Sequence, residues 1–492
     1  MNRHSIAELV LLAALSCGAA ARADGPELGG KAASLADCVR QAVARNLGLQ
    51  AERLVREQAA LAARASEESF WPGVEIGLGY ADAREPLDAG GVASSGTLTY
   101  DAALVVRTPV GTDVRASLTN GRRGTDDAGA AFDPEHSARL ELRITQPLLA
   151  GFGLEVNTAP IEHARLAHRR AVADFRARLN DLVLEVEQAY WDLFFSQQDV
   201  ELKARSLERA QRQYGDTAEN IRRGLLPEHD IYVVEENVVS FERKLLQARN
   251  ALAAARSALA ERMQLDPAEA DGLVAGEQPD PERIQPASPE ALLTSAKDLN
   301  PELLAARTRF EEARIDLAVA ENERLPGLDL DAGLRYNGLG GAVGDAWERI
   351  GEGDDRELFA GLRLNVPIFR LFDDAIERQA HLELQRRKLE HDERLARLGF
   401  ELRDAHRDIL HGLRSLELAG RVSELARQKL EAQQEKYKAG VAPLKDLVQF
   451  LRELDEAELA RLQVLVDLSK NAAELHRQVG DLHTLRGIEV RE

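Results

Sequence analysis

The chain has 492 residues, of which 30% are charged and only 5% are aromatic, and its formal net charge is −20 at pH 7. This composition is poor in the bulky residues of a thick globular core and is typical of long helices and coiled coils. The acidic balance argues against nucleic acid and anionic lipid headgroups as partners.

The first 23 residues have the pattern of a secretory signal peptide, which we expect to be removed. Arg3 supplies a positive charge, Leu9 to Leu15 form a short apolar stretch, and Ala21-Arg22-Ala23 is a small-x-small cleavage site. Cys17 leaves lipoprotein processing open as a competing interpretation.

Beyond the signal, the cysteine content is minimal. Cleavage after Ala23 would leave Cys38 as the only cysteine, so no disulfide could form within the chain. Cys38 lies on the apolar face of a helical pattern, and we expect it to be a small buried residue. No later segment has the roughly 20 apolar residues of a membrane helix.

A fixed order of segments occurs twice along the chain. Each time, a helical pattern gives way to short alternating segments, and long helices follow. Such a duplicated helix–strand–helix unit predicts repeated architecture rather than two unrelated domains. We divide the chain after the signal into a first repeat, a proline-rich linker and a second repeat, at residues 24–265, 266–289 and 290–492.

The alternating segments, at about 73–146 and 327–366, carry apolar residues at every second position. Clear examples are Val74-Glu75-Ile76-Gly77-Leu78 and Leu362-Arg363-Leu364-Asn365-Val366. Strands with one apolar and one polar face suit a membrane β-barrel, but also a two-faced sheet in a soluble protein. Open sheet edges cannot lie in lipid, and one chain has too few strands to close a channel-sized barrel. Membrane insertion would therefore require an oligomer.

Long helical segments follow each set of strands, at about 147–265 and 367–480. From Val234 to Leu259 the apolar positions alternate steps of four and three residues, which is the seam of a coiled coil. The C-terminal helix carries two apolar stripes, which suits a helix packed against neighbours on both sides. A helix of about 40 residues is about 60 Å long, more than a compact domain needs.

Each helical segment contains one sharp turn with the same spacing. Gly224 and Gly440 are each followed by a proline three residues later and an aspartate six residues later. Glycine commonly ends a helix in a left-handed conformation, and proline suits the first turn of the next helix. Each segment is therefore predicted to be a helical hairpin, and the two tips to be equivalent copies.

Several short stretches, in this order along the chain, resemble the TolC-type outer-membrane efflux protein family. They include Phe70-Trp71-Pro72, Gln146-Pro147-Leu148-Leu149, Ala189-Tyr190-Trp191-Asp192-Leu193, Asn300-Pro301-Glu302-Leu303 and Val366-Pro367-Ile368-Phe369, together with the two tips. No single stretch is specific, but their order, spacing and duplication together are. The resemblance covers nearly all of the chain after the signal.

The resemblance implies a mainly helical protein with a membrane β-domain. It would be a homotrimer in the cell outer membrane that extends into the periplasm as a long coiled-coil α-barrel, and outer-membrane lipid would surround a shared 12-stranded β-barrel. Each copy would supply four strands, and the extra alternating material at 97–120 leaves open whether this chain adds more. Four prolines would lie where helix meets strand: Pro72, Pro147, Pro326 and Pro367.

The function implied is that of a passive, gated exit duct in a tripartite efflux or secretion system. The tips would bind a periplasmic adaptor (membrane fusion) protein, which links the channel to an inner-membrane pump that supplies the energy. Small-molecule efflux and type I protein secretion are both compatible with the sequence. A periplasmic coiled-coil scaffold that binds protein partners is the alternative from another class.

The resemblance also assigns residues to the channel entrance. Tyr437 matches an aromatic gating position, Asp446 matches an acidic position that narrows the entrance, and Asp230 is the first-repeat equivalent of Asp446. Three copies of a carboxylate around an axis would attract cations. Alternatively, each aspartate is simply favoured in the first turn of its helix. Contacts with the adaptor are expected at the tips, namely at Gly224, Leu225, Gly440 and Val441.

Motifs for catalysis or cofactor binding are missing from the sequence. It contains no Walker loop, no nucleophile elbow and no His-Glu-x-x-His, and its histidine pairs are five residues apart, so they do not share a helix face as a metal pair would. We therefore expect no enzyme activity, no cofactor and no bound metal.

Overall fold

The computed structural model describes residues 32–86, 92–125, 131–366, 374–439 and 441–489. The expected signal peptide, Cys17, Pro367 and Gly440 lie outside these residues. The chain divides into two compact units. One unit comprises the described residues up to Gln50, those from Arg178 to Leu293 and those from Glu401 onwards, and the other comprises 51–177 and 294–400.

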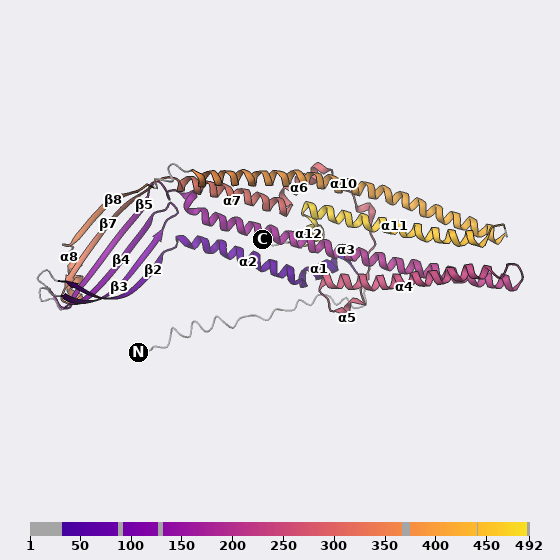
Figure 1. The fold of residues 1–492 in the computed structure, drawn as a ribbon, viewed down its shortest axis with the longest axis horizontal. Helices are drawn as coiled ribbons and strands as arrows, with labels where there is room; N and C mark the ends of the chain where they lie inside the picture. The colour runs from indigo at the N-terminus through magenta and orange to yellow at the C-terminus, as the bar shows by residue number, and fades with distance from the viewer. Residues whose placement is uncertain (1–31, 87–91, 126–130, 367–373, 440, 490–492) are drawn as a thin grey trace. The chain divides into compact units, whose positions relative to one another are not determined.

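The unit of residues 51–177 and 294–400 contains a six-stranded sheet (Figure 1). Its strands follow the order β2-β3-β4-β5-β7-β8, and every neighbouring pair is antiparallel. Their bounds are Gly73–Pro86, Val92–Arg107, Asp113–Thr125, Glu135–Pro147, Gly327–Gly340 and Arg356–Asn365. Pairing of β5 with β7 therefore joins the strands of the first repeat to those of the second.

Residues 97–120, whose role the sequence left open, lie in β3 and β4. These strands are joined by a tight turn in which the N–H of Thr108 donates to the carbonyl of Thr112 (2.9 Å). Gly111 in this turn has a φ of +93°, a conformation that favours glycine. The described sheet thus has six strands rather than the four that the resemblance implied, because the extra segment alternates regularly enough to form a hairpin of its own.

One face of the sheet is apolar across all six strands. One row of cross-strand partners is entirely apolar: Val74, Leu104, Ala116, Leu142, Leu334 and Leu358. The adjacent row points to the opposite face because successive strand residues alternate, and it is mostly polar: Glu75, Ala103, Ser117, Glu141, Arg335 and Glu357. On that polar face Arg335 pairs with Glu141 (3.0 Å) and with Glu357 (2.7 Å).

Helices meet the sheet at prolines. Helix α2 (Leu47–Glu67) and a short 3-10 helix (Glu68–Phe70) precede Pro72 and β2, and α7 (Pro301–Glu323) precedes Pro326 and β7. Strand β5 ends at Pro147 before α3 (Leu154–Arg222) begins. Between β7 and β8, helix α8 (Val343–Glu352) packs on the sheet, where the Trp347 indole N–H donates to the Asn120 side chain (3.1 Å).

The other unit is built mainly from helices. Its helices, some of which continue into the sheet-containing unit, are α1 (Leu35–Arg45), α3, α4 (Asp230–Met263), α5 (Pro267–Ala270), α6 (Pro289–Leu299), α10 (Ala375–Lys438), α11 (Leu444–Val479) and α12 (Leu482–Leu485). The pairs α3–α4 and α10–α11 form two helical hairpins (Figure 1). Among the described helices, none is both long enough and apolar enough to cross a membrane.

In this helical unit, the Tyr190 side chain links two segments of backbone that are far apart in the sequence. A two-residue strand β1 (Ala32–Ala33) pairs in parallel with β6 (Val274–Ala275). The buried Tyr190 hydroxyl donates to the Ala33 carbonyl (3.0 Å) and accepts from the Glu277 N–H (2.9 Å). Burial raises the pKa of Tyr190 to about 12, so the hydroxyl keeps the proton that it donates.

Cys38 is buried in α1 as expected, and we predict that its thiol is unreactive in the folded protein. Burial raises the pKa of Cys38 to about 12, so at pH 8 the thiol stays protonated, and only the thiolate is a nucleophile. A water-soluble maleimide at pH 8 should leave the Cys38 peptide unmodified by mass spectrometry, whereas denaturation before labelling should modify it completely. Modification of the folded protein at the rate of an exposed thiol would contradict the packing of α1.

Candidate functional site

The tips of the two helical hairpins are built in the same way. Gly224 has a φ of +77°, and the N–H of Leu225 donates to the carbonyl of Asn220, five residues earlier (2.9 Å). The N–H of Val441 donates to the carbonyl of Lys436, also five residues earlier (3.0 Å). Leu225 and Val441 are both strongly exposed. Each tip therefore presents an apolar side chain at the same place in the same turn.

The aspartates predicted for the entrance lie at the start of the second helix of each hairpin. Asp230 is the first residue of α4, Asp446 is the third residue of α11, and both are half-buried. A carboxylate in the first helical turn is stabilised by the partial positive charge of the helix N-terminus. Their positions fit this local role, and a role at an entrance depends on further copies of the chain.

Tyr437 lies near the end of α10 and contacts the other hairpin. Within its own hairpin, its ring packs against an apolar cluster made of Leu430, Leu447, Leu451 and Leu454. Its hydroxyl is buried beside Thr217 and Gln213 of α3, without a hydrogen bond of good geometry. Burial raises the pKa of the Tyr437 hydroxyl, and the nearby negative charge of Asp230 adds to that rise. The structure therefore brings together two of the three predicted entrance residues, one from each hairpin.

A buried ion pair also joins the two hairpins, between α3 and α11. Asp455 of α11 is 3% exposed, and its Oδ1 lies 2.7 Å from Nη2 of Arg209 on α3. The Ser206 hydroxyl donates to the same oxygen (2.6 Å). Burial raises the pKa of Asp455, although the hydrogen bond from Ser206 and the charge of Arg209 act in the opposite direction. Helix α11 is thereby tied to α3 by a carboxylate that is removed from water.

A further contact ties α11 to the other helix of the first hairpin. The Arg452 guanidinium donates through Nε to the side-chain oxygen of Asn237 on α4 (3.1 Å), and Asn237 is buried. Glu236 lies 3.9 Å from the same guanidinium. Helix α11 therefore makes polar contacts with both helices of the first hairpin.

Sequence reasoning did not single out Asp455 or Arg209. A signal was present in the α11 pattern, where Leu444, Val448 and Leu451 lie on the buried face and Asp455 follows at the next step of four. A charged residue in an otherwise apolar seam indicates a specific partner on the facing helix. The partner could not be named, because Arg209 is 246 residues away in the sequence.

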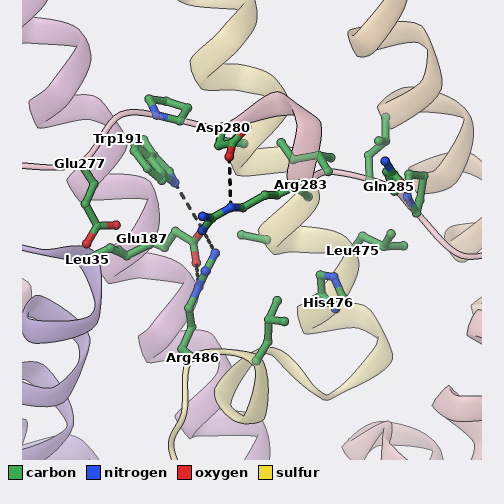
Figure 2. A pocket seen from close by; sticks show the side chains of 18 of the residues that line it. Leu35, Glu187, Trp191, Glu277, Asp280, Arg283, Gln285, Leu475, His476 and Arg486 are labelled. Carbon is green, nitrogen blue, oxygen red and sulfur yellow. Dashed lines mark hydrogen bonds and ion pairs between the residues drawn. The ribbon is translucent and has the colours of Figure 1, made fainter.

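The helical unit also contains a cavity of about 370 Å³, lined by residues 277–286 and by side chains of α3, α11 and α12 (Figure 2). Most of its charged groups are paired with one another. Glu187 forms an ion pair with Arg486 and accepts from the Trp191 indole N–H (3.3 Å), and Arg283 pairs with Asp280 (3.1 Å). Since these groups satisfy one another, we assign no ligand to the cavity.

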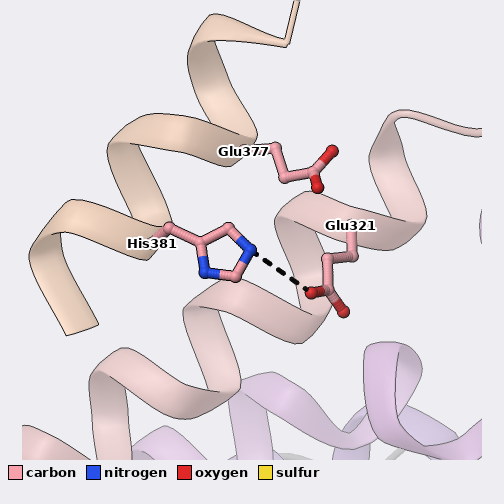
Figure 3. A group of neighbouring side chains, drawn as sticks. All are labelled: Glu321, Glu377 and His381. Atoms are coloured by element: carbon pink, nitrogen blue, oxygen red, sulfur yellow. Dashed lines mark ion pairs between the residues drawn. The ribbon is translucent and has the colours of Figure 1, made fainter. Parts of the chain in front are cut away.

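Three side chains in the sheet-containing unit lie close enough to share a cation (Figure 3). Glu377 and His381 are four residues apart on α10, and Glu321 faces them from α7, with 3.9 Å between Nε2 of His381 and Oε1 of Glu321. Arg324 already pairs with Glu377 at 2.5 Å. Because a guanidinium occupies one carboxylate, the group has the character of an ion-pair network between two helices.

Comparison with known proteins places this architecture among outer-membrane channels. No protein-family model matches the chain. It is 25% identical to protein CyaE of Bordetella pertussis over 332 residues, which are 67% of this chain and 69% of CyaE. It is also 25% identical to outer membrane protein TolC of Vibrio cholerae over 213 residues, 42% of this chain and 47% of that protein.

Among solved structures, the outer-membrane channel OprN matches with a TM-score of 0.65 and 19% identity, over 91% of this chain and 89% of OprN. The match confirms that the expected combination of long helices and an antiparallel sheet is the fold of these channels. The resemblance to TolC seen in the short motifs is also present in the wider sequence.

Replacement of the buried carboxylate should weaken the contact between the hairpins. In Asp455→Asn the partly exposed Arg209 loses its only charged partner described at this position, at a cost of about 3 kcal/mol, the low end for a buried pair. We expect a lower urea midpoint for loss of helical circular dichroism. Glu456→Gln, an exposed neighbour with the same charge change, should leave the midpoint unchanged. Equal midpoints for the two variants would show that the buried pair does not hold the hairpins.

Proposed function

We propose that this chain, which has the fold of the TolC-type outer-membrane channels, is the exit duct of a tripartite efflux or secretion system. Three copies form a passive channel in the outer membrane, and their helices extend it into the periplasm. The channel is gated at the helical tips, where an adaptor protein connects it to an inner-membrane pump. No chemical step belongs to this chain, because the pump supplies the energy.

The observation that carries this proposal is the apolar face of the sheet. Apolar side chains of this face are exposed on β2, β3, β5 and β8: those of β2 and β8 include Ile76 and Leu358, which are 83% and 85% exposed. A soluble two-faced sheet covers its apolar face with a second layer of structure. Hydrocarbon is the environment that suits a bare apolar face of this kind.

Unpartnered apolar stripes on the helices support assembly from several copies. Tyr232, Val239 and Leu246 are spaced by seven residues on α4, and all three are exposed. A second stripe on α10 comprises Leu418, Val422 and Leu425. Spacings of three, four and seven residues are those of a coiled-coil seam, which needs a facing helix. A neighbouring copy would supply that helix in a closed α-barrel.

The two tips provide the gate and the adaptor contacts in this proposal. In this proposal Asp446 and Asp230 from each copy place carboxylates at the entrance and favour cations there. Tyr437 lies between the two hairpins, with its buried hydroxyl beside Thr217 and Gln213 of α3. The exposed Leu225 and Val441, with the turns at Gly224 and Gly440, offer the adaptor an apolar contact.

Single-channel recording in a planar bilayer tests the duct and its gate together. We expect small, cation-selective openings from the purified trimer. Asp446→Ala removes one carboxylate per copy from the ring that narrows and helps to close the entrance, so it should raise the leak conductance several-fold. Because the carboxylates attract cations, their loss should also weaken block by divalent cations. Glu431→Ala removes the same charge from an exposed position on α10 and should leave both quantities unchanged.

Two results would contradict the proposal at different points. An Asp446→Ala channel with unchanged conductance and block would show that Asp446 only stabilises the first turn of α11. Silence from a folded trimer, both with the native sequence and with Asp446→Ala, would contradict the duct itself and favour a periplasmic scaffold.

A further inference from the structure

We propose that the β3–β4 hairpin is part of the lipid-facing wall of the channel, so that the shared barrel has eighteen strands, six from each of three copies. In this arrangement β8 of one copy pairs with β2 of the next. The inference rests on the proposed function, because such a barrel exists only in a membrane-inserted trimer. It changes the expected size of the barrel and assigns a role to residues 92–125.

The first step is the position of the hairpin within the sheet. Strands β3 and β4 lie between β2 and β5, so every pairing path from β2 to β5 passes through them. The β2–β3 ladder covers 14 residue pairs and the β3–β4 ladder covers 13. A strand needs roughly 9–11 residues to cross a membrane. The hairpin is therefore long enough to span, and the sheet is continuous only if it does.

The second step is the sidedness of the hairpin. On β3, Tyr100 and Leu104 share the apolar face of the sheet, while Asp101 lies on the polar face. On β4, Leu118 lies on the apolar face, and Arg115, Ser117 and Thr119 lie on the polar face. A hairpin that projected into water as a loop, or that filled the lumen as a plug, would not require this alternation. Lipid on one side and a water-filled lumen on the other require it.

The third step concerns the two edges of the sheet. Strands β2 and β8 each have a neighbour on one side only within the described sheet. Their apolar side chains are the most exposed: Ile76 and Leu358 are 83% and 85% exposed, against 46% for Leu104 and 44% for Leu142 in the interior. Backbone groups along an open edge cannot be left unpaired in lipid. Another strand must therefore lie beside each edge.

A second copy of this chain is the occupant that fits these edges. Strand β2 follows a helix and β8 precedes one, and an even number of strands separates the two edges, so they run in opposite directions. Placing β2 of a second copy beside β8 therefore continues the antiparallel order without a break. Six strands closed on themselves would leave no lumen, since about eight strands are already filled by side chains.

The number of strands sets the width of the duct. Barrel diameter grows roughly in proportion to strand number, so eighteen strands give a barrel about one and a half times as wide as twelve. Natural barrels of about 16–18 strands enclose an aqueous channel. The β3–β4 hairpin thus widens the outer-membrane part of the duct by two strands per copy.

Labelling of single cysteines tests whether the hairpin lies in the wall. In proteoliposomes, Leu104→Cys and Leu118→Cys should resist a charged, water-soluble maleimide, because thiols that face lipid stay protonated and out of its reach, whereas Ser117→Cys and Thr119→Cys should react with it. We expect at least a tenfold difference in rate between the two pairs. Native Cys38 stays silent because it is buried. Reaction of all four cysteines with the water-soluble reagent at similar rates would overturn the proposal.

Strand β5 supplies the matched control, because the resemblance already places it in the wall. Leu142→Cys lies on the apolar face and Arg143→Cys on the polar face, so they give the reactivity of positions already expected in the wall. Preferences in β3 and β4 equal to those in β5 would support the inference. Preferences in β5 but not in the hairpin would show that the hairpin is outside the wall.

Cross-linking tests the edge pairing and the number of copies. Glu75→Cys on β2 is combined in turn with a cysteine at each polar-face position of β8: Glu357, Phe359, Gly361, Arg363 and Asn365. For the one combination whose cysteines face each other, oxidation should give bands of one, two and three cross-linked chains on a non-reducing gel, and none larger. Bands of no more than two chains would mean a twelve-stranded barrel of two copies. No cross-link in any register would contradict the edge pairing.

The two proposals fail in distinguishable ways. Absence of the protein from the outer-membrane fraction would overturn the proposed function and this inference with it. An outer-membrane trimer that conducts ions, but whose β3 and β4 cysteines label only from water, would overturn the inference alone.

Discussion

A backbone N–H or C=O group that faces hydrocarbon without a partner costs several kcal/mol. This constraint governs the design of the sheet. In the proposed channel it requires that every strand, including β2 and β8, be paired on both sides, so a single copy would be incomplete in a membrane. The apolar row from Val74 to Leu358 and the polar row beside it fit this proposal, because a closed wall would separate lipid from water. The exposed apolar stripes on α4 and α10 also need a partner, because in water an apolar helix face is stabilised by packing against another helix.

Much of this fold could be predicted from the sequence because its local signals are duplicated. Pro72 follows Asn46, and Pro326 follows Asn300, by the same 26 residues. Each asparagine caps the start of a helix by accepting from an N–H three residues later, at 2.9 Å in both copies, and each proline precedes a strand. The glycine turns at the two tips repeat in the same way. Signals of this kind act within a few residues, so a single sequence contains them completely.

The features that the sequence did not determine are those that depend on distant partners. Alternation showed that residues 97–120 have the pattern of strands, but it could not show whether they belong to one long bent hairpin or form an additional hairpin, because register and neighbours are set by pairing. The Arg209–Asp455 pair is a second example, since its members are 246 residues apart. Tyr437 was assigned to the entrance by resemblance, and only the structure shows that its hydroxyl is buried beside Thr217 and Gln213.

The choice of a carboxylate at position 455 bears on how such a duct could open. A leucine there would continue the apolar seam of α11, and separating the hairpins would expose it to water with no compensation. An ion pair behaves differently, because both charged groups regain hydration when they part, and this offsets much of the lost attraction. The pair nevertheless specifies one alignment of α3 and α11 while the hairpins are together, through the fixed geometry of Ser206, Arg209 and Asp455. If the proposed channel is gated by separation of its hairpins, a buried ion pair in an otherwise apolar seam suits that contact, because it is well defined when closed and can also open.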